Sequence, residues 1–209
     1  MERPILLGIA GGTASGKTLV ARRVVEDLGS NEVVIIDQDS YYRDMKHLSE
    51  EERARINYDH PDAFDREFLL EHIQALLRGQ PIEKPVYDYK HHRRREDTFR
   101  IEGHSVVILE GILVLEDPAL RRLMNIKVFI DADADTRLIR RIRRDVAERD
   151  RSLESILTQY EDQVRPMYEQ FIAPSKRYAD IIVPEGGKNS VAIDLLVTKV
   201  RSMLRNDDA

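Results

Sequence analysis

The stretch Gly8-Ile9-Ala10-Gly11-Gly12-Thr13-Ala14-Ser15-Gly16-Lys17-Thr18 decides the fold of this chain. It follows the apolar run 5–7 and precedes a pattern typical of a helix, and its spacing of glycine, lysine and threonine matches the Walker A pattern. Glycines allow backbone N–H groups to converge on phosphate oxygens, and the following helix adds the positive end of its dipole. The sequence therefore predicts a strand, a phosphate-binding loop and a helix, with the phosphates held by Gly11, Gly12, Thr13, Ala14, Ser15, Gly16, Lys17 and Thr18.

Side chains in and beyond this loop are predicted to serve the nucleotide and its metal ion. We expect Lys17 to reach the β- and γ-phosphates and the Thr18 hydroxyl to bind Mg²⁺. Glu110 ends the apolar stretch 105–109, and a carboxylate at that end of a buried strand approaches Mg²⁺ directly or through water. The sequence thus predicts a site for a nucleoside triphosphate with Mg²⁺.

Apolar runs and helical periodicity outline the remaining fold. Continuous apolar runs typical of buried parallel strands occur at 33–36, 105–111, 126–130 and 179–184. Helical spacing is found at 19–28, 68–77, around 137–146, over 153–172 with an expected interruption at Pro166, and at 191–197, before a tail at 205–209 that we expect to be frayed. Strands that alternate with helices predict an α/β domain over 1–209, with a mostly parallel sheet flanked by helices.

Two segments depart from this alternation. The stretches 85–89 and 98–101 alternate apolar and polar residues around a charged centre, which predicts an inserted β-hairpin arm at about 81–103. The segment at about 141–160 is rich in arginine, and Arg137, Arg140, Arg141 and Arg144 share one face of a helix. Because the planar guanidinium fork suits phosphate oxygens, we expect this segment to form a lid.

Composition narrows the function. The 209 residues carry a formal net charge of −5, which argues against broad binding to nucleic acid or to an anionic membrane and favours small-molecule chemistry. The absence of cysteine excludes disulfides, cysteine-ligated zinc and a catalytic thiol. No apolar run reaches membrane-spanning length and no signal-peptide pattern opens the sequence, so we expect a cytoplasmic location without nucleic-acid or membrane partners.

A phosphate-binding loop alone leaves kinases, GTPase switches and motor ATPases open. The Asn-Lys-x-Asp type motif that reads guanine in GTPases does not occur in the sequence. Acids follow the second strand at Asp37 and Asp39, and arginines occur late in the chain. An acid near an acceptor hydroxyl together with a cationic lid is the equipment of a small-molecule kinase.

The chain resembles the uridine kinase (uridine-cytidine kinase) family of P-loop nucleoside kinases over nearly its whole length. The specific blocks are Asn57-Tyr58-Asp59-His60-Pro61-Asp62-Ala63-Phe64-Asp65 and Pro85-Val86-Tyr87-Asp88-Tyr89. Further blocks are Gln38-Asp39-Ser40-Tyr41-Tyr42, Glu110-Gly111-Ile112-Leu113, Asp131-Ala132-Asp133-Ala134-Asp135-Thr136-Arg137-Leu138 and Arg140-Arg141-Ile142-Arg143-Arg144-Asp145 through to Tyr178-Ala179-Asp180.

This resemblance implies phosphorylation of the 5′-hydroxyl of uridine and cytidine by ATP or GTP with Mg²⁺, in pyrimidine salvage. It also implies a homotetramer and feedback inhibition by UTP and CTP. By the same resemblance, Asp39, Lys17, Arg144 and Arg149 are catalytic, Arg151 binds the nucleotide, and Thr18, Glu110 and Asp39 serve the metal. The nucleoside is assigned to Asp39, Tyr42, Tyr58, Asp59, Tyr87, His92, Arg141 and Gln159.

Three alternatives stay open at this stage. Because His91 and His92 are adjacent, a register slip in the hairpin would exchange the histidine that reads the base, although counting five residues on from Tyr87 selects His92. The chain is also compatible with another kinase of the same fold group, such as phosphoribulokinase or pantothenate kinase. A regulator that binds nucleotide but transfers nothing is the third.

Overall fold

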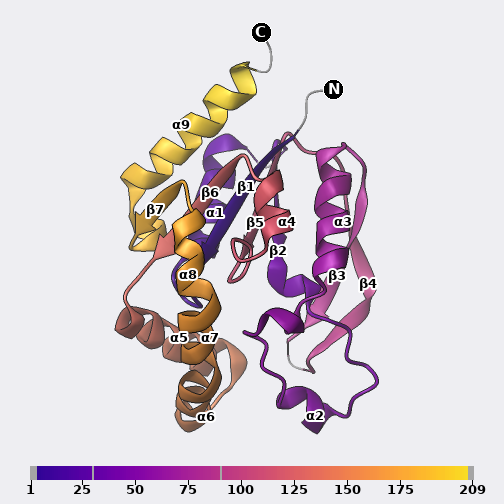
Figure 1. The fold of residues 1–209 in the computed structure, drawn as a ribbon, viewed down its shortest axis with the longest axis vertical. Coiled ribbons are helices and arrows are strands. Elements are labelled where there is room, and N and C mark those ends of the chain that lie inside the picture. The colour runs from indigo at the N-terminus through magenta and orange to yellow at the C-terminus, as the bar shows by residue number, and fades with distance from the viewer. Residues whose placement is uncertain (1–3, 30, 90, 207–209) are drawn as a thin grey trace.

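A five-stranded parallel sheet forms the centre of the molecule in this computed structural model, which describes residues 4–29, 31–89 and 91–206 (Figure 1). Its strands are β1 (Ile5–Gly11), β2 (Val33–Asp37), β5 (Val106–Gly111), β6 (Ile126–Asp131) and β7 (Ile181–Pro184), in the order β2-β5-β1-β6-β7. Every neighbouring pair is parallel. The prediction of a mostly parallel sheet is therefore confirmed, with β1 and its phosphate-binding loop at the middle.

Helices cover both faces of this sheet. The helices α1 (Lys17–Leu28) and α9 (Ser190–Asn206) pack on one face, where Leu7 and Ile9 of β1 lie in the same apolar cluster as Val24 and Leu196. On the other face, α3 (Arg66–Leu77) and α4 (Pro118–Leu123) pack against a cluster that contains the alternate β1 residue Leu6. Successive residues of a strand point to opposite faces, so a continuous apolar run is what a sheet covered on both sides requires.

The predicted hairpin arm is present as a separate two-stranded sheet. Its strands β3 (Ile82–Asp88) and β4 (Arg93–Ile101) are antiparallel, and they pair from Ile82 opposite Ile101 to Asp88 opposite Arg93, with an irregularity between Pro85 and Tyr87. The strands are longer than the alternating stretches of sequence indicated. The arm stands beside α3 (Figure 1).

The segment between β2 and α3 is more structured than its polar sequence indicated. It begins with a 3₁₀ turn, η1 (Gln38–Tyr41), continues through the short helix α2 (Glu50–Ala54), and ends with a second 3₁₀ turn, η2 (Pro61–Ala63). Ser49 caps α2 because its hydroxyl accepts a hydrogen bond from the backbone N–H of Glu52. The loop between these turns lies at the end of the arm where β3 and β4 are joined (Figure 1), and Arg53 there donates to the carbonyl oxygen of His91 at 3.2 Å.

The arginine-rich segment forms α5 (Ala134–Arg149), which ends at Asp150 in a left-handed conformation with φ of 51°. A new helix, α6 (Leu153–Gln159), starts after the cap residue Ser152, as predicted. The prediction that Pro166 interrupts the helix is wrong, because the chain stays helical through that residue. The backbone stays right-handed and helical through wide π-type turns at Tyr160–Val164 and Tyr168–Ile172, which alternate with α7 (Arg165–Met167) and α8 (Ala173–Ser175). Wider turns accommodate the missing proline N–H without a break.

The chain closes with a 3₁₀ turn (Lys176–Tyr178), strand β7, a further 3₁₀ turn, η6 (Gly186–Lys188), and α9. The helix α9 is longer than the predicted 191–197 and reaches Asn206, so the expected frayed tail is helical up to that residue. The rest of that tail, 207–209, lies outside the described residues. Among the helices that the structure describes, none combines the length and the apolar character that a membrane crossing needs.

Candidate active site

The carboxyl ends of the central strands bring the predicted chemistry to one edge of the sheet. The phosphate-binding loop follows β1, the acids Asp37 and Asp39 stand at and after the end of β2, and Glu110 lies near the end of β5. Asp37 is directly opposite Glu110 in the register of the two parallel strands. Ligands of open α/β sheets bind at this edge.

Close approach and backbone conformation both explain the glycines of the phosphate-binding loop. Gly16 has a φ of 98°, in the left-handed region that favours glycine. A Cβ on Gly11 would lie 2.7 Å from the backbone carbonyl oxygen of Ile130, closer than side-chain carbons approach such atoms. Ala14 is also left-handed, at 58°, which is a strained conformation of the kind found at functional sites.

Thr18 and Glu110 meet where Mg²⁺ is expected. The Thr18 hydroxyl donates a hydrogen bond of 2.9 Å to Oε2 of Glu110. Burial raises the pKa of the Glu110 carboxyl, and Lys17 and the Thr18 hydrogen bond oppose that shift. A buried carboxylate of this kind lacks full charge compensation, which a divalent cation supplies.

This pair fits a magnesium ion that keeps water and phosphate in its coordination shell. Within the described ranges, no group of three or more histidine, cysteine or acidic side chains forms a metal cage. Mg²⁺ is commonly held by one or two protein ligands together with phosphates and water, so no cage is required.

Asp39 lies between the phosphate side and the acceptor side of the site. Burial raises the pKa of its carboxyl, Lys17 lowers it, Asp37 raises it, and Arg149 and Arg144 lower it. The Tyr42 hydroxyl is 3.5 Å from Oδ1 of Asp39, at the long limit of a hydrogen bond. Asp39 is therefore influenced by Lys17 and contacts Tyr42, which belongs to a cluster of aromatic side chains.

Aromatic side chains from three segments form this cluster, which we call the aromatic pocket because the nucleoside is assigned to it. The Tyr42 ring lies 5.1 Å from that of Tyr58, 5.0 Å from that of Tyr87 and 4.5 Å from that of Phe64. His92 stacks on Tyr58 with ring centroids 4.9 Å apart. The segment after β2, the 57–65 block and the hairpin arm thus converge at Tyr42, Tyr58, Tyr87 and His92, which the resemblance assigns to the nucleoside.

The two neighbouring histidines of the hairpin have different surroundings. Nδ1 of His91 lies 2.8 Å from Oδ2 of Asp88, whereas His92 stacks on the pocket residue Tyr58. Burial lowers the pKa of His92, and the cations Arg151 and Arg53 lower it further, so its neutral form is favoured. His92 also has a left-handed backbone, with φ of 49°, at the turn that directs it to the pocket.

Asp59 and Arg141 influence one another electrostatically. Burial raises the pKa of the Asp59 carboxyl, and Arg141 is the strongest opposing influence. Burial lowers the pKa of Arg141, with Asp59 and then Asp145 opposing that shift. Arg141 donates hydrogen bonds to the Thr13 hydroxyl at 3.2 Å and to the Gln159 side-chain oxygen at 2.7 Å. This arginine links the phosphate-binding loop to α6.

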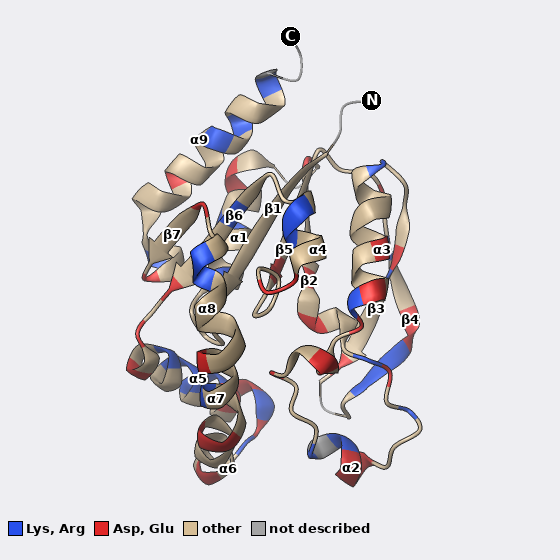
Figure 2. Ribbon diagram, viewed as in Figure 1, with Lys and Arg blue, Asp and Glu red and all other residues tan. Residues whose placement is uncertain are grey.

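Arginines gather along α5 and the segment that follows it, where they are drawn in blue (Figure 2). Arg151 donates to the Gln159 side-chain oxygen at 2.6 Å, and the Arg149 guanidinium lies 5.9 Å from the ring centre of Tyr89 in the arm. Arg144 donates to Asp145 at 2.8 Å. The predicted arginines are thus at the site, near the loop, the pocket and the arm.

The sequence predicted that several arginines share one face of α5. In the structure, two of these arginines are buried. The buried residues of α5 are Arg137, Arg141 and Asp145, while Ile139 and Val146 are about half exposed, at 49% each. The Arg137 guanidinium lies 3.8 Å from the ring centre of Tyr168. An inward polar face and outward apolar residues reverse the usual arrangement, which is expected of a helix that faces a charged ligand.

Sequence reasoning missed several residues of this site. Tyr89 lies 5.4 Å from Tyr87, and alternation along the arm could have found it, because residues two apart share a face. Lys84 is 2.5 Å from Oδ1 of Asp37 and 2.9 Å from the Ser40 hydroxyl. Only the folded arm reveals this contact. Asp145 is the third residue that sequence reasoning missed, and its buried side chain lies among arginines.

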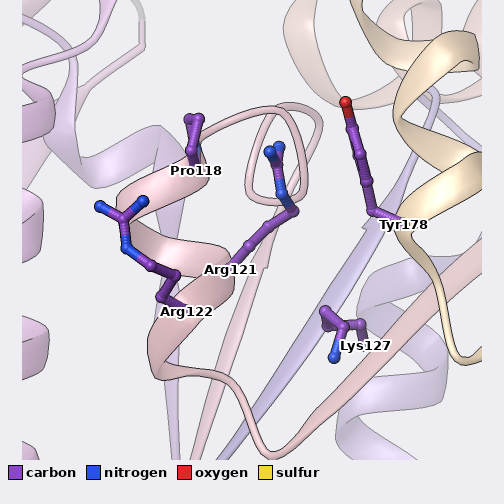
Figure 3. Close-up of a pocket in the computed structure, with 5 residues that line it drawn as sticks. All are labelled: Pro118, Arg121, Arg122, Lys127 and Tyr178. Atoms are coloured by element: carbon purple, nitrogen blue, oxygen red, sulfur yellow. The ribbon is translucent and has the colours of Figure 1, made fainter.

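A separate open pocket of about 250 Å³ lies on α4, β6 and the end of the long helical segment, and its lining includes none of the predicted site residues (Figure 3). Arg121 is engaged there with the Tyr178 ring, 3.8 Å away, and with the carbonyl oxygens of Leu115 and Glu116. Lys127 is paired with Asp180 at 2.9 Å. These cations already have partners, so this pocket does not compete with the edge of the sheet as the candidate site.

Solved structures of other proteins share the fold of this chain. A phosphoribulokinase from Rhodobacter spheroides has a TM-score of 0.66 at 15% identity and covers 87% of this chain and 70% of its own. A D-glycerate 3-kinase from Cryptococcus neoformans has a TM-score of 0.60 at 16% identity, with coverage of 84% and 81%. At such identities these structures support the kinase fold alone.

The sequence relatives are much closer. The uridine kinase of Geobacillus sp. (strain WCH70) is 58% identical over 203 residues, which are 97% of this chain and 96% of that protein. The uridine kinase of Bacillus subtilis (strain 168) is 56% identical over 206 residues, with coverage of 99% and 98%. The family model described as Phosphoribulokinase / Uridine kinase family matches residues 6–192. The resemblance drawn from the sequence motifs is confirmed, and the chain belongs to the Phosphoribulokinase / Uridine kinase family.

Proposed function

We propose that this protein transfers the γ-phosphoryl group of ATP to the 5′-hydroxyl of uridine and cytidine. The observation that carries the proposal is the position of Asp39, between Lys17 of the phosphate-binding loop and Tyr42 of the aromatic pocket. A carboxylate there would orient or deprotonate a hydroxyl that enters from the pocket toward the γ-phosphate. The uridine kinase relatives, which match along nearly the whole chain, support this choice of acceptor.

In this proposal the loop and its neighbouring side chains bind the phosphates and Mg²⁺. The loop 11–18 cradles the phosphates, Lys17 offsets their charge, and Thr18 with Glu110 holds Mg²⁺, with Asp39 near the ion. Bound Mg²⁺ would bridge phosphate oxygens and neutralise charge as the phosphoryl group leaves. GTP would serve as an alternative donor, as the resemblance to the uridine kinase family implies.

The nucleoside side is assigned to the aromatic pocket. Tyr58 and Tyr87 would contact the base, which His92 would read, and Asp59 would accept hydrogen bonds from the ribose. Arg141 and Gln159, joined by a hydrogen bond of 2.7 Å, would hold the ribose from the α5–α6 side. The hairpin arm at about 81–103 is in this view a base-recognition element.

The segment at about 141–160 is proposed to act as a lid. Arg144 and Arg149 would stabilise the transferring phosphoryl group and Arg151 the nucleotide phosphates, because closure excludes water and strengthens each cationic contact. The resemblance adds a homotetramer, feedback inhibition by CTP and UTP, and a role in pyrimidine salvage. The sequence pattern adds a single domain over 1–209 and a cytoplasmic location without nucleic-acid or membrane partners. They complete the proposal.

Turnover with different acceptors tests the proposal. ATP consumption would be measured with uridine, cytidine, thymidine, ribulose 5-phosphate and pantothenate, each with Mg²⁺ and each with a control that lacks the acceptor. We expect turnover with uridine and cytidine. Turnover with ribulose 5-phosphate or pantothenate instead would indicate another kinase of this fold group, and no turnover with any acceptor would indicate a regulator that binds nucleotide.

A further inference from the structure

Asp145 is the one acid on the buried face of α5. Its side chain is 0% exposed, and the other buried residues of that helix are Arg141, one turn earlier, and Arg137, two turns earlier. Removal of a carboxylate from water is costly unless cations and hydrogen bonds compensate it. The surroundings of Asp145 must therefore compensate for the burial of its carboxylate.

Four guanidinium groups surround this carboxylate. Arg144 contacts Oδ1 at 2.8 Å through both Nε and a terminal nitrogen. The other three lie at ion-pair distances of 3.6 Å for Arg141, 3.6 Å for Arg149 and 3.7 Å for Arg151. All four are the arginines that the proposed function assigns to the nucleoside, the nucleotide phosphates or the transferring phosphoryl group.

The backbone of Asp145 also anchors the turn that carries two of them. Its carbonyl oxygen accepts hydrogen bonds from the N–H of Asp150, which caps α5, and from the N–H of Arg151 at 3.2 Å. One residue therefore fixes both the charges of the cluster and the point at which the chain leaves α5.

One acceptor atom and one donor atom of this cluster make no hydrogen bond among the described residues. In the part of the chain that the structure describes, Oδ2 of Asp145 accepts no hydrogen bond, and the buried Nε of Arg141 donates none. Distances of 3.6–3.7 Å are short enough for attraction and too long for hydrogen bonds. The carboxylate thus gathers the guanidinium groups without occupying all of their donors.

We infer that Asp145 is a positioning residue that gathers Arg141, Arg144, Arg149 and Arg151 around one buried negative charge. Without this charge the four cations repel one another at close range, and the lid loses the arrangement in which they meet the phosphates together. This inference deepens the proposed function and rests on its assignment of these arginines to the lid.

Asp145→Asn tests the inference, because it removes the charge and keeps the shape. The matched control is Glu148→Gln, which removes one negative charge from an exposed position three residues further along the same helix. The measurements are kcat, the KM values for ATP and uridine, the melting temperature, and the affinity for inorganic tripolyphosphate by titration calorimetry.

Two effects of opposite sign are expected in Asp145→Asn. The kcat falls at least tenfold, while tripolyphosphate binds at least threefold more tightly, because the cationic cluster has lost its internal counter-charge. A role confined to packing would weaken tripolyphosphate binding or leave it unchanged. The Glu148→Gln control keeps kcat and tripolyphosphate affinity within twofold of the wild-type values.

A kcat in Asp145→Asn within twofold of the control overturns the inference, and so does tripolyphosphate binding that is not tighter. If Asp145→Asn does not fold, Asp145→Asn with Arg149→Gln decides, because removal of one cation relieves the repulsion. A folded double variant supports the inference, and one that stays unfolded overturns it.

Arg144→Ala separates this inference from the proposed function. If Arg144→Ala lowers kcat and Asp145→Asn does not, only the role of Asp145 fails. If Arg144→Ala has the wild-type kcat, the lid assignment fails and the inference fails with it. Tripolyphosphate affinity reports on the cluster even where no acceptor is phosphorylated.

Discussion

The imidazole of His92 stacks on the ring of Tyr58, with the centroids 4.9 Å apart and the planes 14° from parallel. The stack joins the hairpin arm to the 57–65 block, two segments that the sequence separates by more than thirty positions. Tyr58 is itself held in place, because its hydroxyl donates to the carbonyl oxygen of Arg53 at 3.1 Å. One end of the pocket is therefore set by contacts between arm and loop.

His92 is predicted to let the enzyme accept both pyrimidines. Uridine presents an acceptor at position 4 of the base and cytidine a donor, and a neutral imidazole offers either group by a change of tautomer or ring orientation. His92→Gln keeps both activities, since an amide also donates and accepts. His92→Leu leaves a base group unpaired at a cost of about 1–3 kcal/mol, so kcat/KM falls roughly tenfold or more for uridine and for cytidine.

The neighbouring histidine supplies the matched control. His91 is paired with Asp88 and not with the pocket aromatic residues, so His91→Leu is expected to retain kcat/KM for both nucleosides within about threefold. The reverse result, with His91→Leu impaired and His92→Leu normal, would assign base recognition to His91.

Much of the fold could be predicted because its signals are local. The phosphate-binding loop is a contiguous motif, and the buried strands are apolar runs that need no partner to be recognised. Asp39 and Glu110 could be found for the same reason, because each follows such a run. Topology then brings their strand ends to one edge.

The burial of the arginines could not be predicted, because a helical wheel shows which residues share a face and not what that face contacts. The spacing predicts that Arg137 and Arg141 share a cationic face, but it does not show that this face, together with Asp145, is buried in the protein. The contact of Lys84 with Asp37 joins residues 47 positions apart and exists only once the arm has docked. Such long-range polar contacts leave no periodic signal in one sequence.

Asp39→Asn is predicted to bind ATP nearly normally and to lose about 10²- to 10⁴-fold in kcat, the range of a general base. Lys17 and the loop remain to hold the phosphates, so only the acceptor hydroxyl loses its partner. Because the pKa of Asp39 is raised, the wild-type kcat/KM also falls as pH drops through that pKa, when the carboxyl takes up a proton. Titration calorimetry with ATP and a steady-state assay with uridine test both parts. A kcat near wild type in this variant would remove Asp39 from the mechanism.

Asp59 is predicted to make the enzyme prefer ribonucleosides. A carboxylate can accept hydrogen bonds from the 2′- and 3′-hydroxyls together, and deoxyuridine would leave one oxygen of a buried carboxylate unpaired. Hydrogen bonds to charged groups contribute about 1.5–3 kcal/mol, so kcat/KM for deoxyuridine should be lower by roughly 10- to 100-fold. Asp59→Asn should narrow this difference. Equal kcat/KM values for uridine and deoxyuridine in the wild type would contradict the assignment.

Arg144→Ala is predicted to lower kcat by about 10²- to 10³-fold, as loss of one donor to a transition-state charge does, with a smaller rise in the KM for uridine. Arg144 is 30% exposed and paired with Asp145, so the fold should tolerate its truncation. Arg143→Ala, an exposed arginine on the same helix, is the control and should keep its kcat. An unchanged kcat in Arg144→Ala would mean that this arginine does not contact the phosphates.

Glu110→Gln is predicted to stabilise the protein at pH 7 in the absence of nucleotide and Mg²⁺. Burial raises the pKa of Glu110 above its ordinary value of 4.5, so the folded state holds this proton more tightly than the unfolded state. The stability from that preference is present at low pH and is lost as pH rises from about 4.5 through the raised pKa, which leaves a buried charge at pH 7. Glutamine avoids this charge and can still accept the Thr18 hydrogen bond.

Each kcal/mol gained raises the melting temperature by about 2–4 °C for a chain of this size. The gain should shrink as pH falls through the raised pKa, because the wild-type carboxyl then takes up its proton. Mg²⁺ with ATP should stabilise the wild type more than the variant. Thermal melts over a series of pH values test this expectation, and a Glu110→Gln melting temperature below that of the wild type at pH 7 would contradict it.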